Sequence, residues 1–367
     1  MQDELDWLVS IKENTIGFLE KLRSESQPGY YHYSATGDLF GEEMRWGLGN
    51  AVFAVKILYT LGQLEVISEN RRKVLADFII SFQKEDGSIS DPLVHRKSRL
   101  SNLKNAIRNF SFSNIIGEQT IRAETRQAMS SLQLLDIRPE RMYRKIPYEV
   151  EGVENYLRSL NWRDPWSAGS HFSHLLFFHN YNGTAFGHRR EESERMMDVA
   201  IDFINRMQSK NDGVWYAGTS IPVQLKINGA MKILTGLKAA GRMDFKYPEK
   251  IIDLVLPAEN NEHSCDNFNI VYVLKYANEM TDGTYRNPEI QDFCRRRISI
   301  YRKYYHPNTG GFSFFPGQSN IGYYGARITK GLNEPDIHGT CLFLWGISLI
   351  CQILDFSTHL GYKEFVA

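Results

Sequence analysis

The apolar positions of this chain recur at three- and four-residue steps in six separate segments, which is the spacing of a helix face. These segments are residues 47–61, 122–135, 167–178, 223–240, 267–280 and 338–354. More polar amphipathic segments lie before or between them, with good examples at residues 3–23, 69–83, 191–208 and 288–304. Strand signals are short and scarce, so the alternation of apolar and polar helices predicts an all-α fold.

A Gly-rich turn that carries an acid or an amide follows a polar segment at three places. It reads Gln83-Lys84-Glu85-Asp86-Gly87-Ser88, then Gln208-Ser209-Lys210-Asn211-Asp212-Gly213, then His306-Pro307-Asn308-Thr309-Gly310-Gly311. A unit that repeats at a loose period is one piece of a larger ring or stack. We therefore expect residues 1–367 to form a single α/α toroid domain of about six inner and six outer helices, with an open helical array as the alternative.

The composition narrows the choice of partners. Lys and Arg together number 43, as do Asp and Glu, so no global basic field points to nucleic acid. The four cysteines have no paired short spacing, which is typical of a reduced protein rather than a disulfide scaffold. No signal peptide is visible, and the longest apolar run is too short to cross a bilayer. We expect a cytoplasmic protein without a transmembrane segment, whose partner is a small-molecule or oligosaccharide substrate.

The loops before the six inner segments are the predicted place of the site, because the free N–H groups of inner helices would gather at one mouth of a toroid. The sixth loop places the carboxylate of Asp336 two residues before His338. In the third, His171 and His174 share one helix face, where a neutral imidazole can act as a general base. These four are the predicted catalytic residues. A helix cap is the alternative for Asp336, and a hydrogen-bonded core position is the alternative for the histidines.

Aromatic and polar residues in or near these loops are candidates for substrate binding. They are Trp46, Trp166, Trp215, Tyr181, Arg122 and Asn228. The second loop also supplies Glu124 and Arg126. Ordinary surface ion pairing is the alternative interpretation for the arginines.

The sixth loop carries a resemblance to a known superfamily. A Gly310-Gly311-Phe312 turn is followed by Asp336, His338 and Thr340-Cys341 at the start of an inner segment. In this respect the chain resembles terpenoid cyclases and protein prenyltransferases, and the turns at Gln83 and Gln208 are similar to the Gln/Trp repeat of the cyclases. The resemblance implies an enzyme acting on an isoprenoid-type or other apolar substrate in a central aromatic cavity. It also implies zinc at Cys265, Asp266 and His338, whose side-chain types bind that metal.

The chain departs from this superfamily in two ways that leave other functions open. The Asp-rich acid of the cyclases is absent, and Cys265 and Asp266 are adjacent rather than separated by one residue. A helix cap is the alternative role for Asp266. A carbohydrate-active enzyme on the same toroid is the alternative function. A polysaccharide lyase would use Asn180, Tyr181, Arg189 and the two histidines of the third loop. A glycoside hydrolase would use two carboxylates, for which the candidates are Asp38, Asp266 and Asp336. A non-catalytic binding or scaffold protein is the third possibility.

Overall fold

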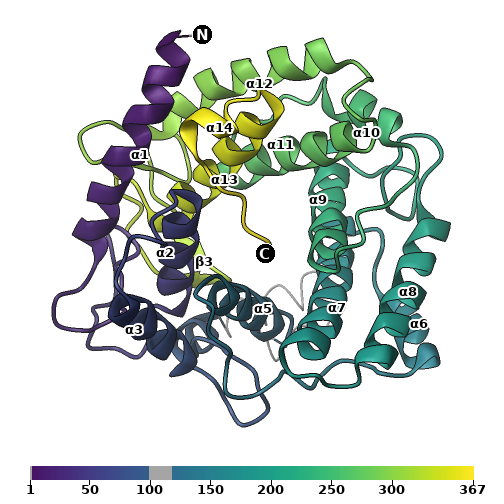
Figure 1. Ribbon diagram of the computed structural model, residues 1–367, viewed down its shortest axis with the longest axis horizontal. Coiled ribbons are helices and arrows are strands. Elements are labelled where there is room, and N and C mark those ends of the chain that lie inside the picture. Colours follow the sequence, from purple (N-terminus) through teal and green to yellow (C-terminus); the bar gives the residue numbers. More distant parts are fainter. Residues whose placement is uncertain (1, 99–117) are drawn as a thin grey trace. The chain divides into compact units, whose positions relative to one another are not determined.

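The computed structural model describes residues 2–98 and 118–367, and most of these residues lie in helices (Figure 1). The all-α prediction is therefore confirmed. Each of the six apolar segments forms a helix: α2 (Leu48–Thr60), α5 (Glu118–Leu134), α7 (Pro165–Ala185), α9 (Val223–Ala239), α11 (Ser264–Glu279) and α13 (Ile337–Ile353). The four polar segments form α1 (Gln2–Leu22), α3 (Glu69–Ile80), α8 (Arg190–Met207) and α12 (Asn287–Tyr301).

Several shorter elements complete the described part. The helices that the sequence pattern did not reveal are α6 (Val150–Ser159), α10 (Pro248–Val255), α14 (Ser357–Leu360) and a helix that begins at residue 92 and is described to residue 98. A one-turn 3-10 helix covers Arg302–Tyr304. Two antiparallel ladders of two residues per strand pair β1 (Tyr305–His306) with β2 (Gly311–Phe312), and β3 (Gly322–Tyr323) with β4 (Ala326–Arg327). Among the described residues, no helix is long and apolar enough to cross a membrane.

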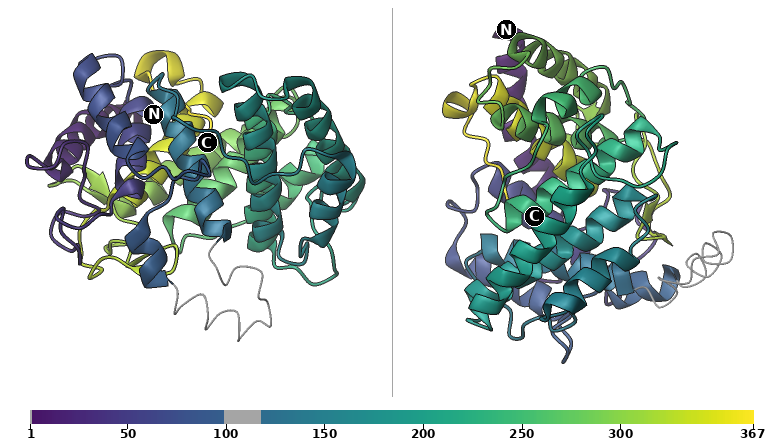
Figure 2. Two further views of the ribbon diagram at one scale, coloured as in Figure 1. Left: turned by 90° about the horizontal axis from the view of Figure 1, so that it is seen from below. Right: turned by 90° about the vertical axis from the view of Figure 1, so that its right-hand side faces the viewer.

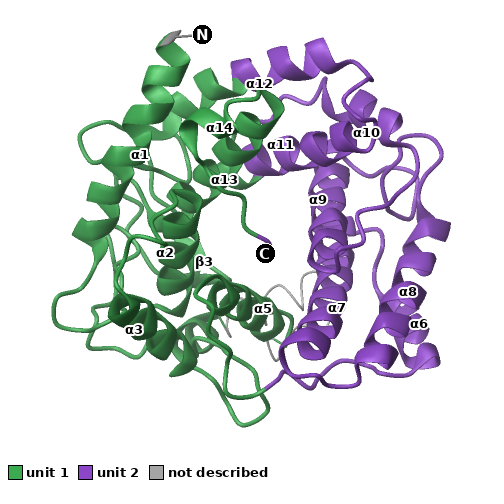
Figure 3. Cartoon of the chain, in the orientation of Figure 1, with its two compact units in different colours: residues 1–141, 262–265, 297–365 green, residues 142–261, 266–296, 366–367 purple. Residues whose placement is uncertain are grey.

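The chain divides into two compact units, which are coloured separately in Figure 3. Unit 1 contains residues 1–141, 262–265 and 297–365, and unit 2 contains residues 142–261, 266–296 and 366–367. In unit 1, α2 packs against both α13 and α5. All but one residue of α2 are buried, which explains why this segment is apolar on nearly every face.

In unit 2, α7 and α9 pack along their length and run parallel (Figures 1 and 2). The hydroxyl groups of Ser173 and Thr235 lie 3.1 Å apart, and further along both helices the Asn180 side chain donates to the Ala239 carbonyl at 2.7 Å. Close approach depends on glycine: a Cβ atom on Gly229 would lie 2.6 Å from the Cβ atom of Pro165. The small residues in these segments therefore let the two helices touch backbone to backbone.

The repeated turn has the same local structure in both units. In unit 1 the Gln83 amide donates to the Gly87 carbonyl at 3.2 Å and exchanges two hydrogen bonds with the backbone of Arg141. In unit 2 the Gln208 amide donates to the Gly213 carbonyl at 2.6 Å and bonds the backbone of Lys246 in the same two ways. Gly87 and Gly213 have φ angles of 82° and 76°, a region that favours glycine. In both units the glutamine side chain therefore has a structural role, because it links the turn by hydrogen bonds to the backbone of a later segment.

Candidate functional site

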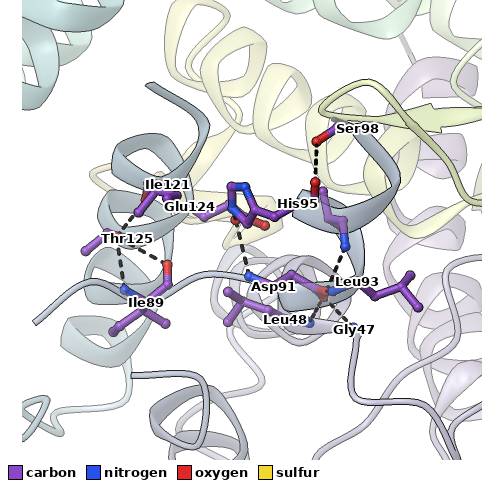
Figure 4. Close-up of polar contacts among 11 residues, drawn as sticks. Gly47, Leu48, Ile89, Asp91, Leu93, His95, Ser98, Ile121, Glu124 and Thr125 are labelled. Atoms are coloured by element: carbon purple, nitrogen blue, oxygen red, sulfur yellow. Dashed lines mark hydrogen bonds and ion pairs between the residues drawn. The ribbon is translucent and has the colours of Figure 1, made fainter. Parts of the chain in front are cut away.

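Asp91 in unit 1 fastens two helix N-termini to each other (Figure 4). One carboxylate oxygen accepts from the backbone N–H groups of Gly47 and Leu48, at 2.8 and 3.3 Å, where α2 begins. The other accepts from Leu93 and Val94, at 3.0 and 3.2 Å, in the helix that begins at residue 92 and is described to residue 98. Burial raises the pKa of Asp91, and these backbone donors oppose that rise. Both oxygens of Asp91 are thus occupied by backbone N–H groups, so its role is to hold the two helix N-termini together.

Glu124 on α5 lies beside this clamp, and its partners are different (Figure 4). Its side chain is 1% exposed, and one oxygen lies 2.8 Å from Nε2 of His95 and accepts from the Asp91 N–H at 3.3 Å. The other oxygen is buried and has no hydrogen-bond partner among the described residues. Burial raises the pKa of Glu124 to about 7, and His95 opposes that rise. The group can therefore hold or release a proton near neutral pH.

His95 connects the buried carboxyl group to solvent. Its side chain is 18% exposed, while the Glu124 carboxyl beyond it is enclosed. The next residue on α5 fixes the register, because the Thr125 hydroxyl accepts from the Ile89 N–H at 3.0 Å. Two consecutive residues of α5 therefore have different roles. Thr125 holds the segment that follows the Gln83 turn, and Glu124 contacts His95. A buried acid with an accessible imidazole partner is suited to proton transfer.

The β3–β4 hairpin brings two tyrosines to the same region of unit 1. Tyr324 and Gly325 form its turn with φ angles of 48° and 81°, as in the tight turns that match the twist of paired strands. Burial is the main cause that raises the pKa of both Tyr323 and Tyr324, and the charge of Glu124 contributes to both. Tyr323 is buried, whereas Tyr324 is partly accessible. The hairpin therefore places phenol groups within electrostatic range of the acid.

His338 is held by an aromatic and amide shell in unit 1. Its Nδ1 lies 3.2 Å from the Tyr33 hydroxyl, and its ring stacks on Phe53 with the centroids 4.5 Å apart. The Asn320 amide donates to the same Tyr33 hydroxyl at 3.0 Å. The ring centroids of Tyr33 and Tyr323 lie 6.4 Å apart, so this shell continues into the surroundings of Glu124. His338 itself is partly exposed.

Asp336 caps α13, which is the alternative that the sequence left open. One oxygen accepts from Gly339 N–H at 2.8 Å, and the other from Phe314 and Asn320 N–H at 2.8 and 3.0 Å. The residue is fully buried. Burial raises the pKa of Asp336 to about 7, against the lowering effect of these donors. Its two oxygens are thus committed to the backbone, which argues against the catalytic role we predicted for it.

The other predicted residues are distributed over both units. His171 and His174 lie on α7 in unit 2, where Nδ1 of His171 lies 2.6 Å from the Tyr156 hydroxyl. Trp46, Trp215 and Tyr181 are buried, whereas Trp166 is 44% exposed. Arg122 is partly exposed at the start of α5. Asn228 bonds to a carboxylate in unit 2.

The predicted zinc ligands do not fit a metal. Within residues 2–98 and 118–367, no three His, Cys, Asp or Glu side chains are grouped as a metal site requires. The carboxylate oxygens of Asp266 instead accept hydrogen bonds from Asn228 and Asn260, at 3.0 and 2.8 Å. The expected site at Cys265, Asp266 and His338 is therefore corrected: Asp266 orients amide side chains, and we derive no zinc chemistry.

The sequence pattern places Glu124 only among the residues of a loop and assigns no role to His95 or Asp91. For Asp91 a signal existed, because an Asp directly before a Pro marks a helix start. For His95 there was none, since its pairing with Glu124 spans 29 positions and exists only in the folded chain.

The chain matches no protein-family model and no curated protein. The resemblance to terpenoid cyclases and prenyltransferases therefore stays a prediction.

Proposed function

We propose that this protein is an enzyme that transfers protons at unit 1, with Glu124 as the general acid and His95 as the group that exchanges protons between Glu124 and solvent. One observation carries the proposal: a buried, half-bonded carboxyl group lies 2.8 Å from an imidazole that solvent reaches. General acids work best when their pKa lies near the operating pH, and that of Glu124 is raised to about 7.

A carbohydrate is the substrate class that this acid favours. A carboxylic acid with a pKa near 7 matches the task of protonating a glycosidic oxygen, as raised-pKa glutamic acids do in glycoside hydrolysis. It is a poor match for protonating an alkene, which calls for a stronger acid. We therefore place the carbohydrate-active alternative, a glycoside hydrolase or polysaccharide lyase, ahead of the isoprenoid enzyme.

An isoprenoid-type substrate is the second candidate, and a different observation favours it. The rings of Phe53, Tyr33 and Tyr323 surround His338, with centroid distances between 4.5 and 6.5 Å. Aromatic faces stabilise cationic character in a bound substrate. In this case Glu124 and His95 would accept the proton that a cationic intermediate loses rather than supply the first one.

The α/α toroid belongs to the proposal as well. We propose that the six apolar helices form its inner layer, as the repeated turns predict. The acid–base site does not depend on a closed ring, because Glu124, His95 and Asp91 all belong to unit 1.

The test compares two substrate panels on the full chain: neutral and uronate-containing oligosaccharides, and prenyl alcohols with their diphosphates. For the panel that the protein turns over, we expect Glu124→Gln to lower kcat/KM by about 10²- to 10⁴-fold. The matched control is Glu118→Gln, an exposed carboxyl group on the same helix, which should leave kcat/KM unchanged.

The pH profile supplies an independent readout. Because the acid must carry its proton, kcat/KM should fall as the pH rises through about 7. A variant Glu124→Gln that is as active as the unmodified protein would refute the assignment. If neither panel is turned over, the non-catalytic binding alternative takes precedence.

A further inference from the structure

Unit 2 contains a pocket that shares no residue with the proposed acid–base site. It is open on one side, has a volume of about 430 Å³ and is lined by Met142, Arg144, Tyr148 and His188. This volume falls in the range of small-molecule sites. We propose that the pocket binds a small organic carboxylate, with its anionic end at Arg144 and its apolar body against the Tyr148 ring.

A single buried residue, Asn182, positions two walls of the pocket. It is fully buried on α7, and its side-chain amide donates to the Tyr148 hydroxyl at 3.1 Å and to the Tyr143 carbonyl at 2.8 Å. The backbone carbonyl of Asn182 accepts a hydrogen bond from the backbone N–H of His188 at 3.1 Å. The Tyr148 and His188 walls are therefore fixed from one point, which lowers the ordering cost of binding.

The Tyr148 side chain has a hydroxyl proton to offer. Its oxygen accepts from Asn182, and no acceptor for its proton lies among the residues that the structure describes. Its ring forms T-shaped contacts with the rings of His179 and His188, at centroid distances of 4.9 and 5.3 Å. Burial lowers the pKa of His179 to about 4, so this neighbour is neutral near pH 7. The phenol thus offers one donor and one apolar face to the pocket.

The charges around the pocket favour an anion. Arg189 lies over the Tyr148 ring at 5.1 Å, but it is paired with Glu149 and Glu192 at 3.6 and 3.4 Å. Arg144 is exposed, and in the described parts of the chain its guanidinium has no acidic partner. The positive charge that remains for a ligand is therefore that of Arg144.

The lining distinguishes a carboxylate from an inorganic anion. A guanidinium presents two parallel N–H donors that match a carboxylate. The Met142 side chain and the faces of the two rings offer apolar surface that inorganic phosphate would leave unused. A ligand with a carboxylate on a flat apolar body satisfies both features.

The experiment titrates the full chain with benzoate by calorimetry, with benzamide as the neutral analogue and inorganic phosphate as the alternative anion. We expect saturable binding of benzoate, with benzamide and phosphate each at least about tenfold weaker. Arg144→Ala should weaken benzoate about tenfold or more, and Tyr148→Phe by a smaller factor. Both variants should keep the circular dichroism spectrum of the unmodified chain, because Arg144 is exposed and Phe retains the ring.

The matched control is Arg206→Ala, an exposed arginine about 24 Å further along α8 from its start. It should bind benzoate normally. No saturable benzoate binding in the millimolar range, equal binding of benzamide, equal or tighter binding of phosphate, or an unaffected Arg144→Ala variant would each overturn the proposal. None of these outcomes bears on Glu124, so this site and the proposed function fail independently.

Discussion

Asp336 and Glu124 are two carboxyl groups of unit 1 that are equally well buried. Their hydrogen-bond partners, however, are different. Burial raises the pKa of each to about 7. Asp336 receives three backbone N–H groups across its two oxygens. Glu124 receives one backbone N–H and one imidazole on a single oxygen, and its other oxygen is unbonded among the described residues.

The difference shows how to separate a structural acid from a chemical one. A carboxylate that satisfies several backbone donors stabilises the chain that supplies them, and its removal leaves those donors unpaired. A carboxylate with an open oxygen and a titratable partner contributes less to the fold and can exchange a proton. Perturbed pKa values alone do not make this distinction, because structural networks perturb them as well.

The largest effect that we expect is on stability, at Asp336. Asp336→Ala removes the acceptor of three buried N–H groups, so the free energy of unfolding should fall by about 3–5 kcal/mol, measured by urea denaturation. The control Asp164→Ala removes a cap that accepts one such bond, at Ser167, and should cost about 1 kcal/mol. Equal losses for the two variants would contradict the holding role of Asp336.

The second prediction concerns the pH dependence of stability. In the native state Glu124 keeps its proton up to about pH 7, whereas its ordinary pKa is 4.5. At Glu124 the native state therefore holds more protons between these values, so the contribution of this group to stability falls as the pH rises through the window. Glu124→Gln should remove about 3 kcal/mol of that fall, while Glu118→Gln leaves it in place. Urea denaturation at pH 4.5 and at pH 8 measures how much stability each variant loses between these values. If Glu124→Gln and Glu118→Gln lose the same amount, Glu124 is not the group responsible for the fall.

The sequence predicted the helices much better than it predicted the roles of these acids. The segment 223–240 became α9 (Val223–Ala239), because apolar periodicity is a local property. The helices α6 and α10, with 10 and 8 residues, were too short to produce a clear period. Asp336 is one of the predicted catalytic residues because a carboxylate near a histidine is visible in the sequence, but the convergence of N–H groups from Phe314 and Asn320 is not. The raised pKa of Glu124 is likewise set by burial, which only the folded chain supplies.

A third prediction sharpens the role of His95. Because His95 lowers the pKa of Glu124, His95→Ala should move the upper limb of the kcat/KM profile to higher pH. We also expect kcat/KM near neutral pH to fall by about tenfold, since the buried acid loses its route to solvent. His359→Ala, which removes an exposed histidine from α14, is the control. A drop in rate with no movement of the profile would indicate that His95 only packs against the acid.

We expect the smallest effect from Tyr33→Phe. This variant tests whether the aromatic residues around His338 influence the proton exchange at Glu124. The Tyr33 hydroxyl accepts from Asn320 and lies 3.2 Å from His338, whereas the hydrogen-bond partners of Glu124 in the described chain are His95 and the Asp91 N–H. Its loss should cost about 1 kcal/mol in urea denaturation and leave the pH limb assigned to Glu124 where it is. If Tyr33→Phe moves that limb as His95→Ala does, the aromatic shell and the acid act as one network. The proton pathway would then extend to His338, and the sequence-based prediction of a catalytic role for His338 would gain support.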